Sequence, residues 1–354
     1  MNYVLITGGC GFIGTNFVRY VHQNRPDWRL LNLDLLTYAG NPENLADLKE
    51  DPRYTFIRGD VAHYPTVQSL FAQYPIRKVV HFAAETHVDR SILDPSAFVR
   101  TNVLGTFNLL ESARLAWKDL PESESPRFLH VSTDEVYGSL TSRDPASTEN
   151  SPYAPSSPYA ASKAAADWLA RSYFRTYKFP VLITNCSNNY GPYQFPEKLL
   201  PLVLSQALEG KAIPIYGTGG NVRDWLYVED HCRAVLLALE KGELGECYNI
   251  AGKQETTNLE VVRLLLRLLK EVRPELRLLE ELITFVPDRP GHDWRYALDI
   301  GKIDKALGWR PQVTLEEGLK RTIAWYLSHL DWLDRVRSGA YRYYLQEQYG
   351  STVL

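Results

Sequence analysis

Short apolar runs alternate with amphipathic stretches through the first half of the chain. The runs are continuous, which is typical of strands buried on both faces of a parallel sheet, and the stretches between them follow the helical period. We expect strands at residues 3–7, 29–33, 54–58, 78–82, 127–131 and 181–185, and helices at 12–24, 64–73, 95–116 and 159–177. This alternation predicts an α/β fold with a doubly wound parallel sheet of the Rossmann type, whose ligands bind at the carboxyl ends of the strands.

The second half of the chain is less regular, because Pro and Gly interrupt it and the apolar runs become shorter. We therefore expect residues 1–189 to form the domain that contains the sheet, and residues 190–354 to form mainly a smaller C-terminal α/β lobe. Segments near 228–240 and 315–330 are candidates for packing back on the first domain. The aromatic-rich segment 341–349 has no assigned role.

Composition and charge narrow the functional classes. The net charge is −3, from 39 basic and 42 acidic side chains, so the chain lacks the basic footprint of a nucleic-acid-binding protein. No apolar stretch of about 18 residues indicates a membrane span, and the first strand begins too early for a signal peptide. The four cysteines, Cys10, Cys186, Cys232 and Cys247, form no C-x-x-C pair. They favour small buried side chains over disulfides or a zinc site, and a reducing cytoplasm as the location.

A glycine-rich turn joins the first expected strand to the first expected helix. Residues 9–14, GCGFIG, fit the pattern G-x-G-x-x-G, and Gly8 precedes them. Glycines at positions 8, 11 and 14 let the backbone turn tightly and approach a pyrophosphate, and the helix N-terminus offers its N–H groups to the phosphates. Asp34 follows Gly14 by 20 residues, as expected for a carboxylate that binds the ribose of NAD. The alternative is a tight turn beside a surface aspartate.

Three hydroxyl- and amine-bearing side chains indicate proton transfer near that cofactor. Tyr159 and Lys163 lie four residues apart in a helix that Ser157 is expected to cap, so they share one helix face. A nearby ammonium favours the phenolate of Tyr159, which alone titrates too high to act as a base at neutral pH. Thr133, after the fifth expected strand, would orient a substrate. The spacing Y-x-x-x-K is common in helices and gains specificity only from the glycine loop.

Two adjacent carboxylates, Asp134 and Glu135, follow the fifth expected strand in the sequence STDEVYG. Burying two like charges is costly unless something uses them. Neighbouring residues of an ideal strand point to opposite faces, so both carboxylates reach one ligand only if the chain turns after Thr133. The alternative is an acid pair that caps the following turn.

These motifs together resemble those of the extended short-chain dehydrogenase/reductase superfamily. Further stretches, HFAAETHVDRSI, YAPSSPYAASKAAAD, TNCSNNYGPYQFPEKLLPL, RDWLYVEDH and DRPGHDWRYALD, are similar to the dTDP-glucose 4,6-dehydratase family, and the similarity runs from residue 1 to about 345. The resemblance implies NAD as the cofactor and three steps on a nucleotide-activated glucose: oxidation at carbon 4, loss of water across carbons 5 and 6, and reduction at carbon 6. It implies that Tyr159 takes the proton of the carbon 4 hydroxyl, Glu135 removes the carbon 5 proton, and Asp134 protonates the departing carbon 6 hydroxyl.

The resemblance also assigns binding residues position by position. The residues assigned to the cofactor are Gly8, Gly11, Phe12, Ile13, Gly14, Asp34, Leu35, Leu36, Thr37, Asp60, Val61, Phe82, Ala83, Ala84, Thr101, Tyr159, Lys163 and Asn189. The residues assigned to the substrate are Thr86, Thr133, Asn188, Lys198, Leu199, Pro214, Ile215, Tyr216, Arg223, Asn258, Asp288, Arg289 and His292.

The two arginines, Arg223 and Arg289, suit a diphosphate, and Tyr216 suits stacking on a base, although salt bridges and core packing are the alternatives. No metal ligand set is expected. This chain departs from the family pattern at Thr86, where serine is frequent in the family. It also departs in the connection from Gly138 to Ser156, which is short compared with that of many bacterial members. The resemblance further implies a homodimer formed through helices 95–116 and 159–177 as a four-helix bundle.

Two other functions stay open on the sequence. A nucleotide-sugar 4-epimerase would share the glycine loop, Tyr159 and Lys163 but needs no acid pair. A cofactor-binding sensor would keep the fold without turnover, although the intact Thr133, Tyr159 and Lys163 argue against it. The base of the substrate is favoured as dTDP by resemblance, with UDP and CDP as alternatives.

The carboxylate of Asp34 predicts a preference for NAD over NADP, because it accepts hydrogen bonds from the ribose hydroxyls and repels a 2′-phosphate. A fluorescence titration with both cofactors should show clearly tighter binding of NAD. Equal affinity for the two would contradict the role given to Asp34.

Overall fold

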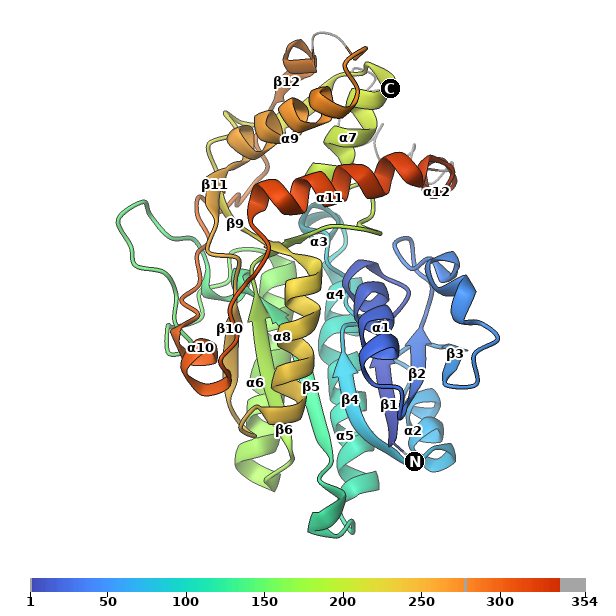
Figure 1. The fold of residues 1–354 in the computed structure, drawn as a ribbon. Coiled ribbons are helices and arrows are strands. Elements are labelled where there is room, and N and C mark those ends of the chain that lie inside the picture. Colours follow the sequence, from blue (N-terminus) through green and yellow to red (C-terminus); the bar gives the residue numbers. More distant parts are fainter. Residues whose placement is uncertain (1, 277–278, 338–354) are drawn as a thin grey trace.

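The computed structural model describes residues 2–276 and 279–337 of the chain, so the aromatic-rich segment 341–349 lies outside the described residues. A seven-stranded, fully parallel sheet forms the lower part of the molecule (Figure 1). Across the sheet the strands are β10 (Cys247–Ile250), β6 (Val181–Cys186), β5 (Arg127–Thr133), β4 (Ile76–His81), β1 (Asn2–Thr7), β2 (Trp28–Asp34) and β3 (Tyr54–Arg58). The predicted doubly wound sheet is therefore confirmed.

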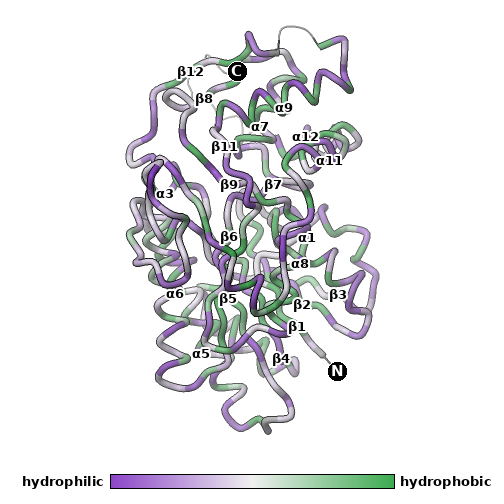
Figure 2. Tube along the Cα trace, turned by 60° about the vertical axis from the view of Figure 1, so that its left-hand side comes forward, coloured by the Kyte–Doolittle hydropathy of each residue, from purple (hydrophilic) through white to green (hydrophobic). Residues whose placement is uncertain are grey.

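Helices cover both faces of this sheet, as the continuous apolar strands require. On one face α1 (Phe12–Asn24) packs against α8 (Val228–Lys241), and their buried residues share an apolar cluster with strands β1, β2 and β5. On the other face lie α2 (Tyr64–Gln73), α5 (Gly105–Trp117) and α6 (Pro158–Tyr177), which share a second cluster. The hydrophobic segments in Figure 2 run through the strands between these layers.

A second group of elements, called here the upper lobe, lies beyond the carboxyl ends of the strands, at the top of Figure 1. It has its own apolar cluster, formed mainly by its helices and by β8. Its elements are β7 (Asn188–Tyr190), α7 (Leu199–Glu209), β8 (Ile213–Tyr216), β9 (Val222–Tyr227), β11 (Glu255–Thr257), α9 (Asn258–Val272), β12 (Ile283–Val286), α11 (Leu315–Ser328) and α12 (Leu330–Val336). Strands β11, β9 and β7 form one small sheet, and β12 pairs with β8.

Short elements complete the described chain. They are α3 (Val88–Leu93), α4 (Pro95–Phe98), α10 (Gly301–Leu307), a π-helix at Val99–Leu104, and 3-10 helices at Pro42–Leu48, Glu122–Glu124, Asp134–Tyr137 and Leu279–Leu282. No helix within the described residues is long and apolar enough to cross a lipid bilayer.

The predicted helical stretch 95–116 is helical throughout, but it contains a π-helical turn that the sequence did not predict. The structure divides this stretch into α4, the π-helix and α5, and the N–H of Gly105 donates to the carbonyl of Arg100 rather than to the residue four before it. The wider turn accompanies contacts of Asn102, whose side chain bonds the backbone of Glu85 and the hydroxyl of Ser162. Periodicity alone could not show this, because the apolar spacing stays helical on both sides.

The two segments expected to return to the first domain behave differently. Residues 228–240 form α8 and pack on the main sheet, as predicted. The same expectation for 315–330 is wrong, because Leu319, Ile323 and Tyr326 of α11 are buried in the upper-lobe cluster. Strand β10, which the sequence did not predict, adds the seventh strand to the main sheet. With α8 and β10 counted in the sheet domain, the division of the chain at residues 189 and 190 stays a proposal.

The connection between Gly138 and Ser156 is fixed along the segment that follows β12, around residues 293–298. Leu140 and Ser147 form bridges with Arg295 and Leu298, and the guanidinium of Arg295 donates to the carbonyls of Thr141 and Asp144. The segment around residues 293–298 is thereby held beside the end of β5.

Candidate active site

The glycine loop between β1 and α1 is packed too closely for side chains at Gly8 and Gly14. A Cβ at Gly14 would lie 2.1 Å from the carbonyl oxygen of Gly8, and one at Gly8, whose φ is +71°, would lie 2.7 Å from the nitrogen of Ala83. Gly11, the N-cap of α1, provides no side-chain cap, so the first N–H groups of the helix are left to other acceptors. The residues after it, Phe12 and Ile13, line a cavity.

Asp34 lies at the end of β2, beside this loop, and is nearly buried. Its carboxylate accepts hydrogen bonds from the N–H of Cys10 at 2.9 Å and of Leu36 at 2.8 Å. Burial raises the pKa of Asp34, and these two N–H groups oppose the rise. The carboxylate is thus fixed in place on the cavity wall, where a ribose would meet it.

The chain turns directly after β5. Thr133 ends the strand, and its hydroxyl oxygen accepts from the N–H of Glu135, which caps the 3-10 helix Asp134–Tyr137. Gly138 ends this turn with φ +80°, where a Cβ would lie 2.2 Å from the carbonyl oxygen of Ala154. Because the strand alternation stops at Thr133, Asp134 and Glu135 both line the same cavity. The turn required by the sequence argument is present.

The two acids differ in their electrostatic surroundings. Burial, followed by the charge of Glu135, raises the pKa of Asp134 to about 8, and Oδ2 of Asp134 is buried without a hydrogen-bond partner. Burial also raises the pKa of Glu135, but the cations Arg223, Lys198 and Arg289 act against that rise. The site therefore favours a protonated Asp134 at neutral pH, and its cations favour ionisation at Glu135 over ionisation at Asp134.

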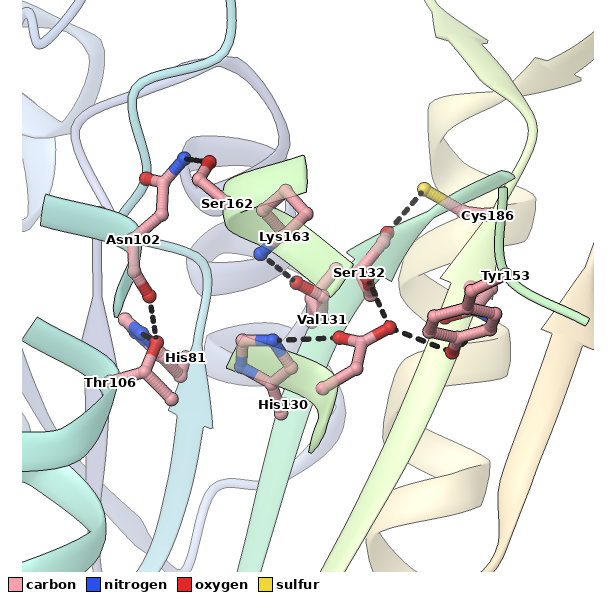
Figure 3. Close-up of polar contacts among 12 residues, drawn as sticks. His81, Asn102, Thr106, His130, Val131, Ser132, Tyr153, Ser162, Lys163 and Cys186 are labelled. Carbon is pink, nitrogen blue, oxygen red and sulfur yellow. Dashed lines mark hydrogen bonds and ion pairs between the residues drawn. The ribbon is translucent and has the colours of Figure 1, made fainter. Parts of the chain in front are cut away.

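Tyr159 and Lys163 extend from α6 into the same cavity. Burial, with the negative charge of Glu135, raises the pKa of Tyr159 well above its ordinary value, and a hydrogen bond with Thr133 opposes this. The ammonium of Lys163 donates to the carbonyl of Val131 at 2.8 Å (Figure 3). Lys163 is thus placed by the backbone of β5, and the protein by itself does not lower the pKa of Tyr159.

A buried chain of hydrogen bonds connects β4 with the helices behind the cavity (Figure 3). The hydroxyl of Thr106 donates to the carbonyl of Asn102 at 2.6 Å, so it accepts from Nε2 of His81 at 3.0 Å. Nδ1 of His81 then accepts from the hydroxyl of Thr7 at 2.7 Å. The amide of Asn102 continues the chain to Ser162, at 2.8 Å. His81 is therefore a neutral structural residue, consistent with a pKa that burial lowers well below its usual range.

One cavity extends from the glycine loop to the acid pair. The residues assigned to the cofactor that line it are Gly8, Gly11, Phe12, Ile13, Gly14, Asp34, Leu35, Thr37, Asp60, Val61, Phe82, Ala83, Ala84, Thr101, Tyr159, Lys163 and Asn189. The catalytic and substrate residues that line it are Thr86, Thr133, Asp134, Glu135, Asn188 and Lys198. The assigned residues outside its lining are Leu36, Leu199, Pro214, Ile215, Tyr216, Arg223, Asn258, Asp288, Arg289 and His292. Among these, the side chain of Ile215 is buried in the upper-lobe cluster.

Four of the outlying residues gather around Asp89 of α3. The hydroxyl of Tyr216 donates to Oδ2 of Asp89 at 3.3 Å, and Nε of Arg289 lies 3.3 Å from Oδ1. The guanidinium of Arg289 lies 4.7 Å from the centre of the Tyr216 ring. His292 meets the edge of that ring and pairs with Asp288 at 2.6 Å. The structure thus brings together residues of β8 and of the 288–292 loop, close enough for Arg289 to act on Glu135.

Several residues near the site were not assigned from the sequence. Glu197 lines the cavity with a nearly buried side chain, and Oε1 accepts from the hydroxyl of Tyr38 at 2.8 Å. Tyr296 lies under Arg223, with the guanidinium 4.4 Å from its ring centre, and donates to Asp293 at 2.5 Å. The charge of Glu197, next to Lys198 in an apolar stretch, was the signal that could have found it.

The residues present fit a dinucleotide. The loop is closed to any Cβ at Gly14, the helix N-terminus is uncapped, and a buried carboxylate stands at the end of β2. These features accept a pyrophosphate and an unphosphorylated ribose.

Comparison with known proteins agrees with this geometry. The model of the GDP-mannose 4,6 dehydratase family matches residues 5–322. The chain is 52% identical to dTDP-glucose 4,6-dehydratase 1 of Escherichia coli (strain K12), an alignment that covers 98% of each chain. It is 51% identical to dTDP-glucose 4,6-dehydratase of Neisseria meningitidis serogroup B, over 97% of this chain and 98% of that one.

The chain belongs to the dTDP-glucose 4,6-dehydratase family. Among solved structures, DesIV of Streptomyces venezuelae, a dTDP-glucose 4,6-dehydratase with NAD and TYD bound, is 46% identical and has a TM-score of 0.87, over 94% of this chain and 99% of that one. The UDP-glucose 4-epimerase of Thermotoga maritima is 30% identical, with a TM-score of 0.81, over 93% of this chain and 99% of that one. The dehydratase family is thus favoured over the epimerase alternative by both sequence and structure.

Two glycine substitutions test the glycine loop. Gly11 has φ −79° and a Cβ there would stay 3.4 Å from its nearest neighbour, so Gly11→Ala should leave the unfolding free energy of the cofactor-free protein within about 0.5 kcal/mol. It should weaken NAD binding at least about tenfold, because the new methyl group faces the pyrophosphate path. Calorimetric titration and denaturant unfolding measure the two effects. Gly14→Ala is the matched control and should lower both stability and affinity, whereas unchanged affinity in Gly11→Ala would contradict the assigned pyrophosphate position.

Proposed function

We propose that this chain is a lyase of deoxysugar biosynthesis, which converts dTDP-glucose to the 4-keto-6-deoxy sugar with NAD as its cofactor. The observation that carries the proposal is the pair Asp134 and Glu135, which share one cavity with Thr133 and Tyr159 and differ in the charges that surround them. An oxidation alone needs a base for one hydroxyl. The additional acid and base are needed only if water is also eliminated.

NAD is proposed to lie along the glycine loop, with its ribose on Asp34 and its nicotinamide beside Tyr159 and Lys163. Bound NAD would take a hydride from carbon 4 and return it to carbon 6 of the same sugar. Tyr159 removes the proton of the carbon 4 hydroxyl, while Thr133 holds that hydroxyl by a hydrogen bond. Because burial and Glu135 raise the pKa of Tyr159, the positive charges of Lys163 and of the bound cofactor are needed to make its phenolate accessible.

The elimination step follows from the acid pair. The carbon 4 ketone acidifies the carbon 5 proton, and Glu135, whose anion is stabilised by Arg223, Lys198 and Arg289, removes it. Asp134, whose pKa of about 8 keeps it protonated at neutral pH, gives its proton to the departing carbon 6 hydroxyl. The acid therefore works below about pH 8 and the base requires its neighbouring cations, so the two roles coexist near neutrality.

The nucleotide is proposed to bind between the cavity and the Tyr216 cluster. Arg223 and Arg289 suit the diphosphate, with Lys198 nearer the sugar, and Tyr216 suits the base. Asn188, Leu199, Pro214, Ile215, Asn258, Asp288 and His292 are proposed to complete the substrate site, the buried Ile215 through its backbone. The base is tested by incubating the protein with dTDP-, UDP- and CDP-glucose and measuring product masses. Loss of one water identifies the dehydratase, the preferred donor identifies the base, and an unchanged mass with inverted carbon 4 would identify the epimerase.

We further propose a cytoplasmic homodimer. The location is supported by the four cysteines, which are all unpaired and buried. The dimer is supported by exposed apolar side chains along one stripe of the π-helix and α5, at Leu104, Phe107 and Leu115, and by Trp168 on the neighbouring α6. A two-fold partner that covers both helices would bury this surface.

The roles of the two acids are separable by isotope exchange. Glu135→Gln and Asp134→Asn should each lower overall turnover roughly 10²- to 10⁴-fold, because each loses one proton-transfer group. Glu135→Gln should still oxidise carbon 4 but exchange the carbon 5 proton slowly in deuterated water, whereas Asp134→Asn should retain more exchange and stall before water loss. Rapid-quench mass spectrometry measures both, with Tyr159→Phe as a control that blocks the first oxidation. The opposite pattern of exchange would reverse the two assignments.

The homodimer predicts that a charge placed in the α5 stripe disrupts assembly. Phe107→Glu should shift the mass measured by light scattering from twice 40.4 kDa towards 40.4 kDa, because two copies of the charge would be buried at the interface. Val272→Glu is the matched control, since Val272 is also exposed and apolar but lies in α9 of the upper lobe. A native chain that is monomeric at working concentration would overturn the proposal.

A further inference from the structure

A carboxylate that does not line the cavity is buried one helical turn after Lys163. Asp167 of α6 is fully buried, and the cavity lining does not include it. Its Oδ2 accepts from the hydroxyl of Ser132 at 2.9 Å and from that of Tyr153 at 2.8 Å (Figure 3). Oδ1 lies 3.2 Å from Nε2 of His130. The two hydroxyl donors stabilise a negative charge on this carboxylate, in a place where a fold alone would prefer an apolar side chain.

The ammonium of Lys163 is also buried, and a neutral carbonyl, that of Val131, accepts its hydrogen bond. A buried ammonium without a compensating negative charge loses its hydration and tends to become a neutral amine. Lys163 must nevertheless stay charged to help Tyr159 lose its proton. A negative charge close to it is therefore a chemical requirement of the site.

The groups that act on Lys163 come from four elements. They are His81 of β4, His130 of β5, Cys186 of β6 and Asp167 of α6 itself. Burial and the charge of Lys163 lower the pKa of both histidines, and burial raises the pKa of the Cys186 thiol to about 12, so all three are neutral at pH 7. Of these groups in the described part of the chain, Asp167 is the one that carries a negative charge.

We infer that Asp167 is a positioning residue, whose buried charge keeps Lys163 an ammonium ion beside Tyr159. The inference rests on the role proposed for Lys163. It explains why Ser132 and Tyr153, from two different segments, both direct their hydroxyl groups to one buried carboxylate. Arg171 is a second cation near the end of this network, with its guanidinium 5.9 Å from the Tyr153 ring, and is the competing partner for the charge.

The direction of the effect follows from the balance at Lys163. Burial lowers the pKa of Lys163 to about 8, and Asp167 is the largest influence that opposes burial. In Asp167→Asn the amide keeps the shape and one acceptor oxygen but removes the charge, so the pKa of Lys163 should fall below neutrality. The fraction of charged Lys163 at pH 7.5 should then drop at least about threefold, because a pKa that falls from about 8 to below 7 takes this fraction from roughly three quarters to less than one quarter.

The direct test is an NMR titration of the full-length protein labelled with ¹³Cε-lysine, without cofactor or substrate. The Lys163 resonance is the one missing in Lys163→Met. In Asp167→Asn its titration midpoint should move down by more than one unit, whereas in the control Tyr153→Phe, which keeps the carboxylate, it should move by less than half a unit. A midpoint unchanged in Asp167→Asn would overturn the inference, whether or not the protein proves to be a dehydratase.

Stability and kinetics supply independent readouts. Denaturant unfolding at pH 7 should show coupling between Asp167→Asn and Lys163→Met, with the double variant more stable than Lys163→Met, which leaves the Asp167 charge unbalanced. Coupling with Arg171→Gln instead would assign the charge to Arg171 and overturn the inference. If Asp167→Asn folds poorly, the same cycle is run with Asp167→Ser.

The pH dependence of the first step, the oxidation of the sugar, should also change. The Glu135→Gln variant is the background for this test, because its reaction is expected to stop after oxidation of carbon 4. In that background the rate of cofactor reduction should fall above about pH 8, where Lys163 loses its charge. Adding Asp167→Asn should move this fall to a lower pH. A rate lowered equally at every pH would indicate a merely structural role. Absence of any sugar oxidation in the parent protein, with the NMR shift present, would reject the proposed function and leave the role of Asp167 in charging Lys163 intact.

Discussion

The site depends on a single hydrogen bond at the end of β5. The hydroxyl of Thr133 accepts from the N–H of Glu135 and so converts a strand into a 3-10 turn within one residue. Without that turn, strand geometry would send Asp134 and Glu135 to opposite faces of the sheet, where helices cover both. With it, two consecutive carboxylates and the capping hydroxyl face one cavity, together with a tyrosine from α6. The 3-10 turn ends at Gly138, which packs so closely against Ala154 that no side chain would fit there.

Because the site is buried, nearby charges strongly affect proton binding and give different roles to chemically similar groups. Asp134 and Glu135 both lose hydration, but Arg223 acts on both acids, whereas Lys198 and Arg289 act on Glu135. The same principle operates beneath the cavity, where Lys163 and Asp167 are both buried and each limits the cost of burying the other. The catalytic groups are therefore sustained by charges that never meet the reacting atoms.

The sequence was sufficient for the features with local signals. The six strands of the first half lie within two residues of their predicted ends, because continuous apolar runs bounded by polar residues allow few alternatives. The glycine loop, Asp34, the acid pair and Tyr159 likewise meet in one cavity. The misses concern contacts between distant segments. The short strand β10 carries too few residues for a periodic signal, the π-helix depends on Asn102 reaching Glu85 and Ser162, and α11 has an amphipathic pattern that would suit either lobe. Tyr296 and Asp167 acquire their places only when β5, α6 and the 293–298 segment come together.

The chain crosses between the main sheet and the upper lobe more than once, so neither part is a contiguous module. After β9 the chain leaves the upper lobe, contributes α8 and the edge strand β10 to the main sheet, and then returns upward through β11 and α9. A fragment cut at residue 189 would therefore lose a covering helix and leave the backbone of β6 as an open edge, ready to pair with other chains. The other fragment would carry α8 and β10 without the sheet on which they pack. Nucleotide-sugar specificity in this architecture cannot be exchanged by transplanting a contiguous C-terminal block, and recombination between relatives is compatible with the fold only if it preserves each of these crossings.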